Sequence, residues 1–155
     1  MYQILFMILF ILQGQIEKRM DLITVTTTVN ASLSKTWEYW TKETHICNWN
    51  FASPDWHCPT ATNNLTIGGE FHYTMAAKDN SMQFDFWGTY QKIETEKHFE
   101  ILLGDGRKMF VQFEQTPTGT IVTEQFEPEN ENPAEMQQMG WQMILDNFKN
   151  YTEGK

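Results

Sequence analysis

Four side chains with metal-binding or nucleophilic chemistry lie within fourteen positions of one another: His45, Cys47, His57 and Cys58. Imidazole nitrogen and thiolate sulfur are ligands that suit Zn²⁺. However, neither pair has the spacing of two to four residues that is typical of zinc sites, and the adjacent His57 and Cys58 are awkward joint ligands. We therefore expect no metal site, and we interpret these residues as two structural thiols and two histidines near the mouth of a pocket.

The same residues raise the possibility of covalent catalysis. Cys58 as a nucleophile, with His45 or His57 as its base, would make the protein a hydrolase or a transferase. No local signature supports this assignment, and the thiol lies beside Pro59 in an aromatic stretch. We assign no catalytic residue and leave enzymatic activity open, with a non-enzymatic role favoured.

Four carboxylates could supply a general acid or base if one of them pointed inward: Asp55, Glu70, Asp85 and Glu124. In a strand such residues usually face water, but Glu124 has the same parity as Val122 and Phe126. Burial would raise the pKa of its carboxyl, as a proton shuttle requires. A buried pairing with Arg107 or Lys108 is the alternative, and we favour it.

The longest helical pattern covers residues 133–151. Pro133 suits a first helical turn, and Asn132 is the expected N-cap. An apolar stripe follows helical spacing through Met136, Gly140, Trp141, Ile144, Leu145, Phe148 and Tyr151. A glycine inside a helix costs about 1 kcal/mol relative to alanine. Gly140 therefore predicts that a backbone, a ring or a bound molecule lies close to the helix at this point.

The remaining elements predict a sheet for this helix to pack on. Residues 21–30 alternate as a strand, and two short helices follow, the first capped by Ser32 or Ser34 and the second at about residues 43–48. Residues 49–59 form a rigid aromatic loop. From Gly68 onward, strands alternate with short turns, and Gly88 is expected at a bulge. The fold class is α+β: a curved antiparallel sheet of about six strands wrapped on the long C-terminal helix, with two short helices after the first strand.

Composition limits the classes of partner. The chain has 155 residues and a net charge of −9, with no Lys or Arg between Met109 and Phe148. A surface of this sign repels phosphate backbones, so we expect no nucleic-acid partner. Two cysteines are too few for a disulfide scaffold, and we expect them to be reduced thiols in the cytoplasm.

The beginning of the chain differs from the rest. Residues 4–12 are a continuous apolar run, too short for a membrane span of about 20 residues. They resemble the apolar part of a signal peptide, yet no basic residue precedes them and no small-residue cleavage site follows. The alternatives are a weak membrane anchor, an uncleaved signal, or translated upstream sequence with the start at Met20, which we favour. We expect residues 1–19 to lie outside a single domain formed by residues 20–155.

Several short motifs, in this order and spacing, resemble a known family. They are Trp37-x-x-Trp40-Thr41, Trp49-Asn50-Phe51-Ala52-Ser53, Asp55-Trp56-His57-Cys58-Pro59, Gly68-Gly69-x-Phe71, Phe84-Asp85-Phe86-x-Gly88-x-Tyr90, Asp105-Gly106-Arg107 and Gly140-Trp141-x-x-Ile144-Leu145-x-Asn147-Phe148. From residue 21 to residue 153 the chain resembles the helix-grip START-like (SRPBCC) superfamily of lipid-transfer, pollen-allergen and polyketide-cyclase proteins. Within it, the chain is similar to domains related to the activator of the heat-shock protein 90 ATPase. The resemblance implies the order β-α-α-β-β-β-β-β-α but no common reaction.

Three functions remain open. We favour binding of a small apolar or aromatic molecule between sheet and helix, without a cofactor and without catalysis. The alternatives are a co-chaperone type of protein-interaction module and a polyketide-cyclase-like enzyme. The expected ligand-binding residues are Trp37, Trp49, Phe51, Trp56, Phe71, Tyr73, Met75, Phe84, Phe86, Gly140, Trp141 and Ile144.

The three functions predict different structures. An open cavity lined by aromatic residues would favour the carrier. A collapsed core with an exposed apolar patch would favour the interaction module. A carboxylate with a perturbed pKa, pointing into the cavity, would favour the enzyme.

Overall fold

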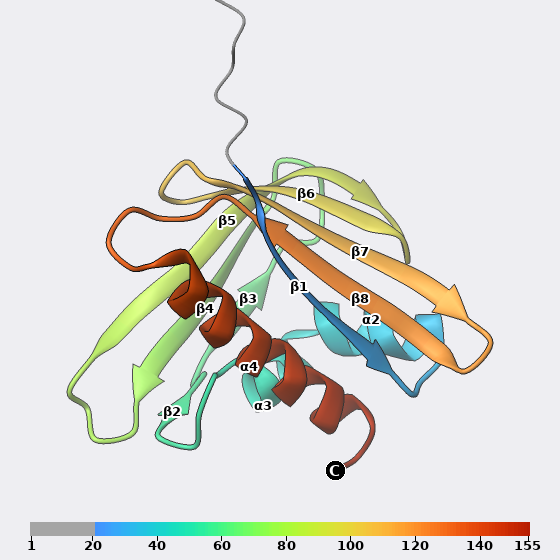
Figure 1. The fold of residues 1–155 in the computed structure, drawn as a ribbon, viewed down its shortest axis with the longest axis horizontal. Helices are drawn as coiled ribbons and strands as arrows, with labels where there is room; N and C mark the ends of the chain where they lie inside the picture. Colours follow the sequence, from blue (N-terminus) through green and yellow to red (C-terminus); the bar gives the residue numbers. More distant parts are fainter. Residues whose placement is uncertain (1–20) are drawn as a thin grey trace, which may run out of the picture.

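The computed structural model of the chain describes residues 21–155. Its elements, in chain order, are β1 (Ile23–Val29), α2 (Leu33–Thr41), α3 (Glu43–Trp49), β2 (Trp56–His57), β3 (Ala61–Asn63), β4 (Glu70–Ala77), β5 (Gln83–Glu94), β6 (His98–Leu103), β7 (Lys108–Thr116), β8 (Gly119–Phe126) and α4 (Ala134–Thr152). Figure 1 shows one curled sheet with α4 lying across its open side and α2 and α3 at one end. This is the predicted α+β helix-grip fold.

The sheet is antiparallel throughout and has the strand order β1-β8-β7-β6-β5-β4-β2, with β3 also paired to β4. From β4 to β8, each strand pairs with its neighbour in the sequence, as the short turns between them predict. The sheet is larger than the predicted six strands. Two short segments, at Trp56 and at Ala61, add to β4 where the sequence indicated only loop.

Side-chain alternation in the first and last strands follows the predicted parity. Ile23, Val25 and Val29 are buried in β1, which pairs with β8 along its whole length. In β8, Val122 and Phe126 are fully buried and Glu124 points to the same side. The buried face of β8 thus carries two polar residues, Thr120 and Glu124, beside Val122 and Phe126, and Glu124 is the ionisable one.

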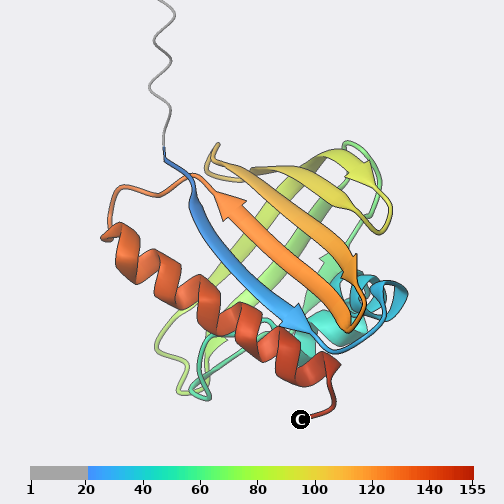
Figure 2. The same cartoon turned by 45° about the vertical axis from the view of Figure 1, so that its right-hand side comes forward.

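Helix α4 packs along β1 and closes the sheet (Figure 2). Leu145 and Phe148 are fully buried, and the ring of Trp141 stacks on Phe126 at a centroid distance of 4.1 Å. On the adjoining side of the helix, Gln138 Nε2 donates to the carbonyl of Thr24 at 3.0 Å. Gln142 Nε2 donates likewise to Thr26, at 3.1 Å. Gln138 and Gln142 lie four residues apart on the helix, and Thr24 and Thr26 lie two apart on the strand, so the two pairs face each other. The glutamine side-chain amides therefore occupy the edge of β1 that no other strand of residues 21–155 covers.

The start of α4 differs from the prediction. Asn132 is not the N-cap, because Pro133 holds that position and makes no side-chain cap hydrogen bond. The turn before the helix is instead held by the buried Gln137, whose amide accepts from the N–H of Glu129 and donates to the carbonyl of Asn132. Met136, placed on the inner stripe by its spacing, is exposed and lines a surface groove.

Two glycines also behave differently from their predicted roles. A Cβ built on Gly140 would meet nothing within 4 Å, so the predicted close approach of a backbone or a ring to the helix is wrong. Gly88, in contrast, is crowded, because a Cβ there would lie 2.9 Å from Ile101 Cγ2, 3.0 Å from the carbonyl oxygen of Leu102 and 3.1 Å from Phe71 Cε1. Gly88 is not the bulge either, since the register of β5 against β6 shifts between Tyr90 and Lys92.

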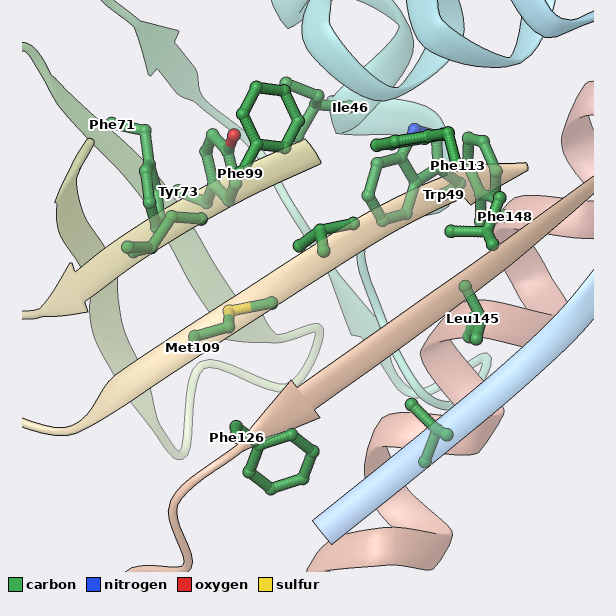
Figure 3. Packing of buried hydrophobic residues seen from close by; sticks show 14 of the residues in the cluster. Ile46, Trp49, Phe71, Tyr73, Phe99, Met109, Phe113, Phe126, Leu145 and Phe148 are labelled. Carbon is green, nitrogen blue, oxygen red and sulfur yellow. The ribbon is translucent and has the colours of Figure 1, made fainter. Parts of the chain in front are cut away.

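The two short helices cover one end of the sheet with aromatic side chains. Ser32 caps α2, because its Oγ accepts from the N–H of Lys35 at 3.3 Å. Trp49, at the end of α3, meets Phe148 of α4 edge to face at 4.9 Å. Figure 3 shows Trp49, Phe113 and Phe148 together at this end, with Phe126 well away from them along β8. One aromatic cluster thus joins the short helices, the sheet and α4.

Among the helices of residues 21–155, none is both long and apolar enough to cross a membrane. The interpretation of residues 1–19 as a leader lies outside the described residues.

Candidate ligand-binding cavity

A cavity of about 240 Å³ lies between the inner face of the sheet and α4. Its walls are mainly aromatic and aliphatic, and they come from α2, α3, five strands, the β6–β7 turn and α4. The lining residues are Trp40, Trp49, Asn50, Phe71, Tyr73, Met75, Phe84, Phe86, Tyr90, Ile101, Arg107, Met109, Val111, Glu124, Trp141 and Ile144. The curled sheet and the helix diverge here, and the side chains between them do not fill the space.

Most of the expected ligand-binding residues meet in this cavity. They are Trp49, Phe71, Tyr73, Met75, Phe84, Phe86, Trp141 and Ile144. The other four lie elsewhere. Trp37 is buried on the ring of Phe99 at 4.6 Å, Trp56 packs edge to face on Phe84 at 6.1 Å, Phe51 is half-buried, and Gly140 opens on a separate groove.

The lining also contains residues that were not assigned to the site from the sequence. They are Trp40, Asn50, Tyr90, Ile101, Arg107, Met109, Val111 and Glu124. Strand alternation carried the signal for Met109 and Val111, which share a parity and are both buried. No pattern could place Arg107, because it lies in the turn between β6 and β7.

Glu124 is the chemically unusual residue of the cavity. It sits in the middle of β8, opposite Val25 of β1 and Val111 of β7, and only 4% of its surface is exposed. Burial raises the pKa of its carboxyl to about 8, with no hydrogen bond or neighbouring charge to offset the loss of water. Within residues 21–155, the Glu124 carboxyl thus has no polar partner.

The favoured pairing of Glu124 with Arg107 or Lys108 is wrong. The guanidinium of Arg107 is bound by Asp105, at 2.7 Å from Nε to Oδ2, and donates from Nη1 to the carbonyl of Glu127 at 3.0 Å. The N–H of Lys108 donates to the carboxylate of Glu127 at 2.7 Å. Arg107 is thus held in the turn between β6 and β7 by Asp105 and Glu127, and Lys108 does not line the cavity that Glu124 faces.

The other polar groups of the cavity are satisfied or neutral. Tyr90 donates its hydroxyl to Asn63 Oδ1 at 2.7 Å, and burial raises its pKa to about 12. Burial also holds the pKa of Tyr73 well above its usual range. The amide of Asn50 lies 3.4 Å from the sulfur of Met75. Both tyrosines therefore keep their protons at every physiological pH.

The histidine and cysteine set does not form a reactive centre. His45 shares a hydrogen bond of 2.8 Å with the hydroxyl of Tyr151 and stacks on Tyr39. The thiol of Cys58 points to the carbonyl of Thr60 at 3.4 Å, and burial, with Cys47 beside it, raises its pKa to about 12. A thiol with so high a pKa is a poor nucleophile. Across residues 21–155, no three His, Cys, Asp or Glu side chains are grouped to hold a metal ion.

A groove of about 330 Å³ lies next to the cavity on the surface. It is lined by Gly140 and Met136 of α4 and shares Arg107, Trp141 and Ile144 with the cavity. The absence of a side chain at Gly140 leaves this groove open above Trp141. The two hollows are thus neighbours with three lining residues in common.

Most of the chain matches one protein-family model. Residues 30–153 match the model of the family described as Activator of Hsp90 ATPase homolog 1-like protein. The chain belongs to this family. The match confirms the resemblance seen in the tryptophan and glycine motifs. No curated protein matches the chain.

Solved structures agree with this family assignment. The chain is 40% identical to the AHSA1-like protein from Aeromonas hydrophila, with a TM-score of 0.81, over 86% of this chain and 92% of that one. It is 50% identical to Chr148 from Cytophaga hutchinsonii, with a TM-score of 0.75 and the same coverage. Protein NE0264 from Nitrosomonas europaea shares the fold at 15% identity, with a TM-score of 0.74 over 88% and 96% of the two chains.

Proposed function

We propose that this family member binds a small, largely apolar molecule in the cavity between the sheet and α4. The observation that carries the proposal is an unfilled space of about 240 Å³ with mainly aromatic and aliphatic walls. Protein interiors are normally packed without such voids, because each one forfeits dispersion contacts. An unfilled hollow of this size, lined by side chains of the core, supports a role as a container.

The size of the cavity sets the size of the ligand. An apolar cavity of about 150 Å³ is enough to bind benzene. The present cavity is larger, so it has room for more than a single ring. Burial of such a molecule between Trp141, Phe86 and Tyr73 would support micromolar affinity, about −8 kcal/mol.

The groove beside Gly140 supplies a route of access. It shares Trp141 with the cavity, and this side chain is half-buried, resting on Phe126 and Phe86. A rotation of the Trp141 ring would connect the two hollows. The glycine then has a function that close packing does not provide: it keeps the approach to Trp141 free.

A thermal-shift screen of fatty acids, sterols, flavonoids and aromatic polyketides tests the proposal. A ligand raises the melting temperature by mass action, and it should also quench tryptophan fluorescence. Trp141→Ala should weaken binding more than it reduces the cooperativity of unfolding. Trp87→Ala is the matched control, because Trp87 lies on the outer face, stacked on His72. If no compound shifts the transition, the carrier proposal fails.

Native mass spectrometry of the freshly purified protein complements the screen. A co-purifying small molecule would appear as an adduct of defined mass that is lost on denaturation. We expect this adduct to be absent from Trp141→Ala and present in Trp87→Ala. An adduct retained equally by both variants would place the bound molecule outside the cavity.

Glu124 favours a second candidate, the polyketide-cyclase-like enzyme. A single buried carboxyl with a pKa near 8 can take or give a proton at neutral pH. Glu124→Gln would then abolish turnover of an aromatic polyketide while leaving its binding intact. Equal rates of product formation in both proteins would remove this candidate.

The outer surface of α4 favours a third candidate, the interaction module. Met136, Met139 and Met143 form an exposed row on the helix. Flexible methionine side chains suit adaptable protein surfaces. The corresponding experiment is the ATPase rate of purified heat-shock protein 90 with this protein added, compared with Met139→Glu. A rate that neither protein changes would exclude this candidate.

A further inference from the structure

We propose that Glu124 is the polar anchor of the cavity and that the bound molecule is uncharged and apolar except for one hydrogen-bond-accepting oxygen, a carbonyl or a hydroxyl. This inference rests on the proposed carrier function and specifies the chemistry of its ligand. It assigns Glu124 a recognition role, with the O–H of its carboxyl donating a hydrogen bond to the ligand oxygen.

The placement of Glu124 supports an anchor. Both neighbours across the sheet, Val25 and Val111, are fully or almost fully buried, so the carboxyl cannot turn to water along the sheet face. On its own strand, Val122 and Phe126 flank it on the same face. Glu124 lines the cavity, so its carboxyl borders that space. A buried polar group without a partner costs free energy that a ligand oxygen would recover.

The charged and titratable groups around the cavity leave Glu124 neutral. Beside Glu124, they are Arg107, Tyr73 and Tyr90. Arg107 is paired with Asp105, and both tyrosines have raised pKa values. Since burial raises the pKa of Glu124 to about 8, its carboxyl is mainly protonated at neutral pH and has one O–H to donate.

Other ligand chemistries fit less well. A carboxylate or phosphate would lie beside a group that becomes negative as soon as it loses its proton, and Arg107 is already occupied by Asp105. An amine would take the proton from Glu124, and the resulting ion pair would be buried among apolar walls, where desolvation offsets much of the attraction. A neutral ligand with an acceptor oxygen can bind the protonated carboxyl without placing any charge in the cavity.

Three probes that differ in one non-hydrogen atom test the inference: methyl naphthyl ketone, isopropenylnaphthalene and 1-naphthylethylamine. The second replaces the carbonyl oxygen of the first by a CH₂ group, so only the acceptor changes. Dissociation constants are measured by calorimetry at about pH 6 and about pH 9, on either side of the Glu124 pKa of about 8. At the lower pH we expect the ketone to bind about tenfold more tightly than the alkene, as one good hydrogen bond implies.

Two variants identify the donor. Glu124→Leu removes every polar atom and should bind ketone and alkene equally. Glu124→Gln keeps an N–H donor that does not titrate, so its preference for the ketone should persist at both pH values. In the wild type the preference should fall below about threefold at the higher pH, because the ionised carboxyl has no proton to donate.

The outcomes separate this inference from the carrier function. Equal binding of ketone and alkene to the wild type would overturn the anchor while leaving the carrier in place. A preference for the ketone that is retained in Glu124→Leu would likewise overturn the anchor. If the amine binds more tightly than the ketone, and only when Glu124 is present, the proposed ligand class changes from neutral to cationic. If none of the probes binds, both proposals fall. Melting curves of each variant confirm that the compared proteins are folded.

Discussion

At the scale of single residues, Glu124 links ligand recognition to the stability of the fold. An unpartnered acid in the core is unfavourable, and it is better tolerated as a neutral group than as a charged one. Its raised pKa means that the folded protein holds a proton that the unfolded chain releases. Stability must therefore depend on pH through this residue.

The predicted direction follows from proton binding. Between the usual carboxyl value of 4.5 and the folded value of about 8, the native state binds more protons, so stability falls as pH rises through this window. Below this window, the protonated carboxyl makes its full contribution to the stability of the fold. The Glu124→Gln side chain does not titrate. The unfolding free energy of this variant relative to that of the wild type should therefore rise across the window by roughly 3–5 kcal/mol. Urea unfolding at several pH values measures it, and a constant difference would contradict the burial of an unpaired acid.

Gly140 and Gly88 form a matched pair for a second prediction. An added Cβ at Gly140 meets open space, so Gly140→Ala should raise the unfolding free energy by up to about 1 kcal/mol. At Gly88 the Cβ would press on Ile101 and Phe71, and Gly88→Ala should cost about 1–3 kcal/mol. Denaturant midpoints decide the point. The reverse order of the two variants would show that the helix, not β5, is the crowded element.

At the scale of elements, the contact between α4 and the edge of β1 protects the sheet. The unpaired edge of a strand is a template for aggregation unless it is covered. Here Gln142 both donates to the carbonyl of Thr26 and accepts from its N–H, at 3.1 and 3.4 Å. A side-chain amide thus takes the place of a further strand.

This contact yields a third prediction. Gln142→Ala should lower the unfolding free energy by about 1 kcal/mol, the usual value for hydrogen bonds that water can partly replace. It should also increase aggregation on mild heating, because the edge of β1 becomes available. Gln83→Ala, at an exposed position on β5, is the control and should change neither property. Identical light scattering from all three proteins would show that the glutamine does not guard the edge.

Most of the helices and strands could be predicted from the sequence. Period-two alternation placed β1 and β8, and period 3.6 placed α4 within one residue at each end. The short strands β2 and β3 could not be predicted, because two or three residues give no periodicity and only pairing with β4 defines them. Met136 was also misplaced, because spacing gives the face of a helix but not which residues of that face are covered.

The candidate site was predictable only in its apolar part. Alternation and aromatic content brought Phe71, Tyr73 and Phe86 to the cavity. Parity also indicated that Glu124 points inward, but the absence of a basic partner within the described residues could not be inferred. Whether Arg107 reaches Glu124 or Asp105 depends on the geometry of a turn, which residue types alone do not specify.

At the scale of the whole molecule, the described residues form one core. It runs from Ile23 in β1 to Phe148 in α4 and includes side chains from the sheet and from all three helices. A continuous core of this kind is expected to unfold as one cooperative unit.

The fourth prediction follows from this core. A chain that begins at Met20 should fold by itself, with a single thermal transition close to that of the full chain. A chain that begins at Thr28 lacks most of β1, and with it Ile23 and Val25, so it should lose the transition. Calorimetry compares the three. An insoluble or non-cooperative protein starting at Met20 would show that earlier residues belong to the core.

The central claim, a ligand bound inside the cavity, is tested most directly by a methyl NMR titration with methyl naphthyl ketone. We predict saturable shifts of the methyl signals of Met109, Ile101 and Ile144, which line the cavity, with no change at Met139 and Met143 on the outside of α4. Val111→Phe, which places a ring in the cavity, should abolish these shifts while the protein stays folded. Shifts confined to the exposed methionines, or no saturable shift at all, would contradict the account.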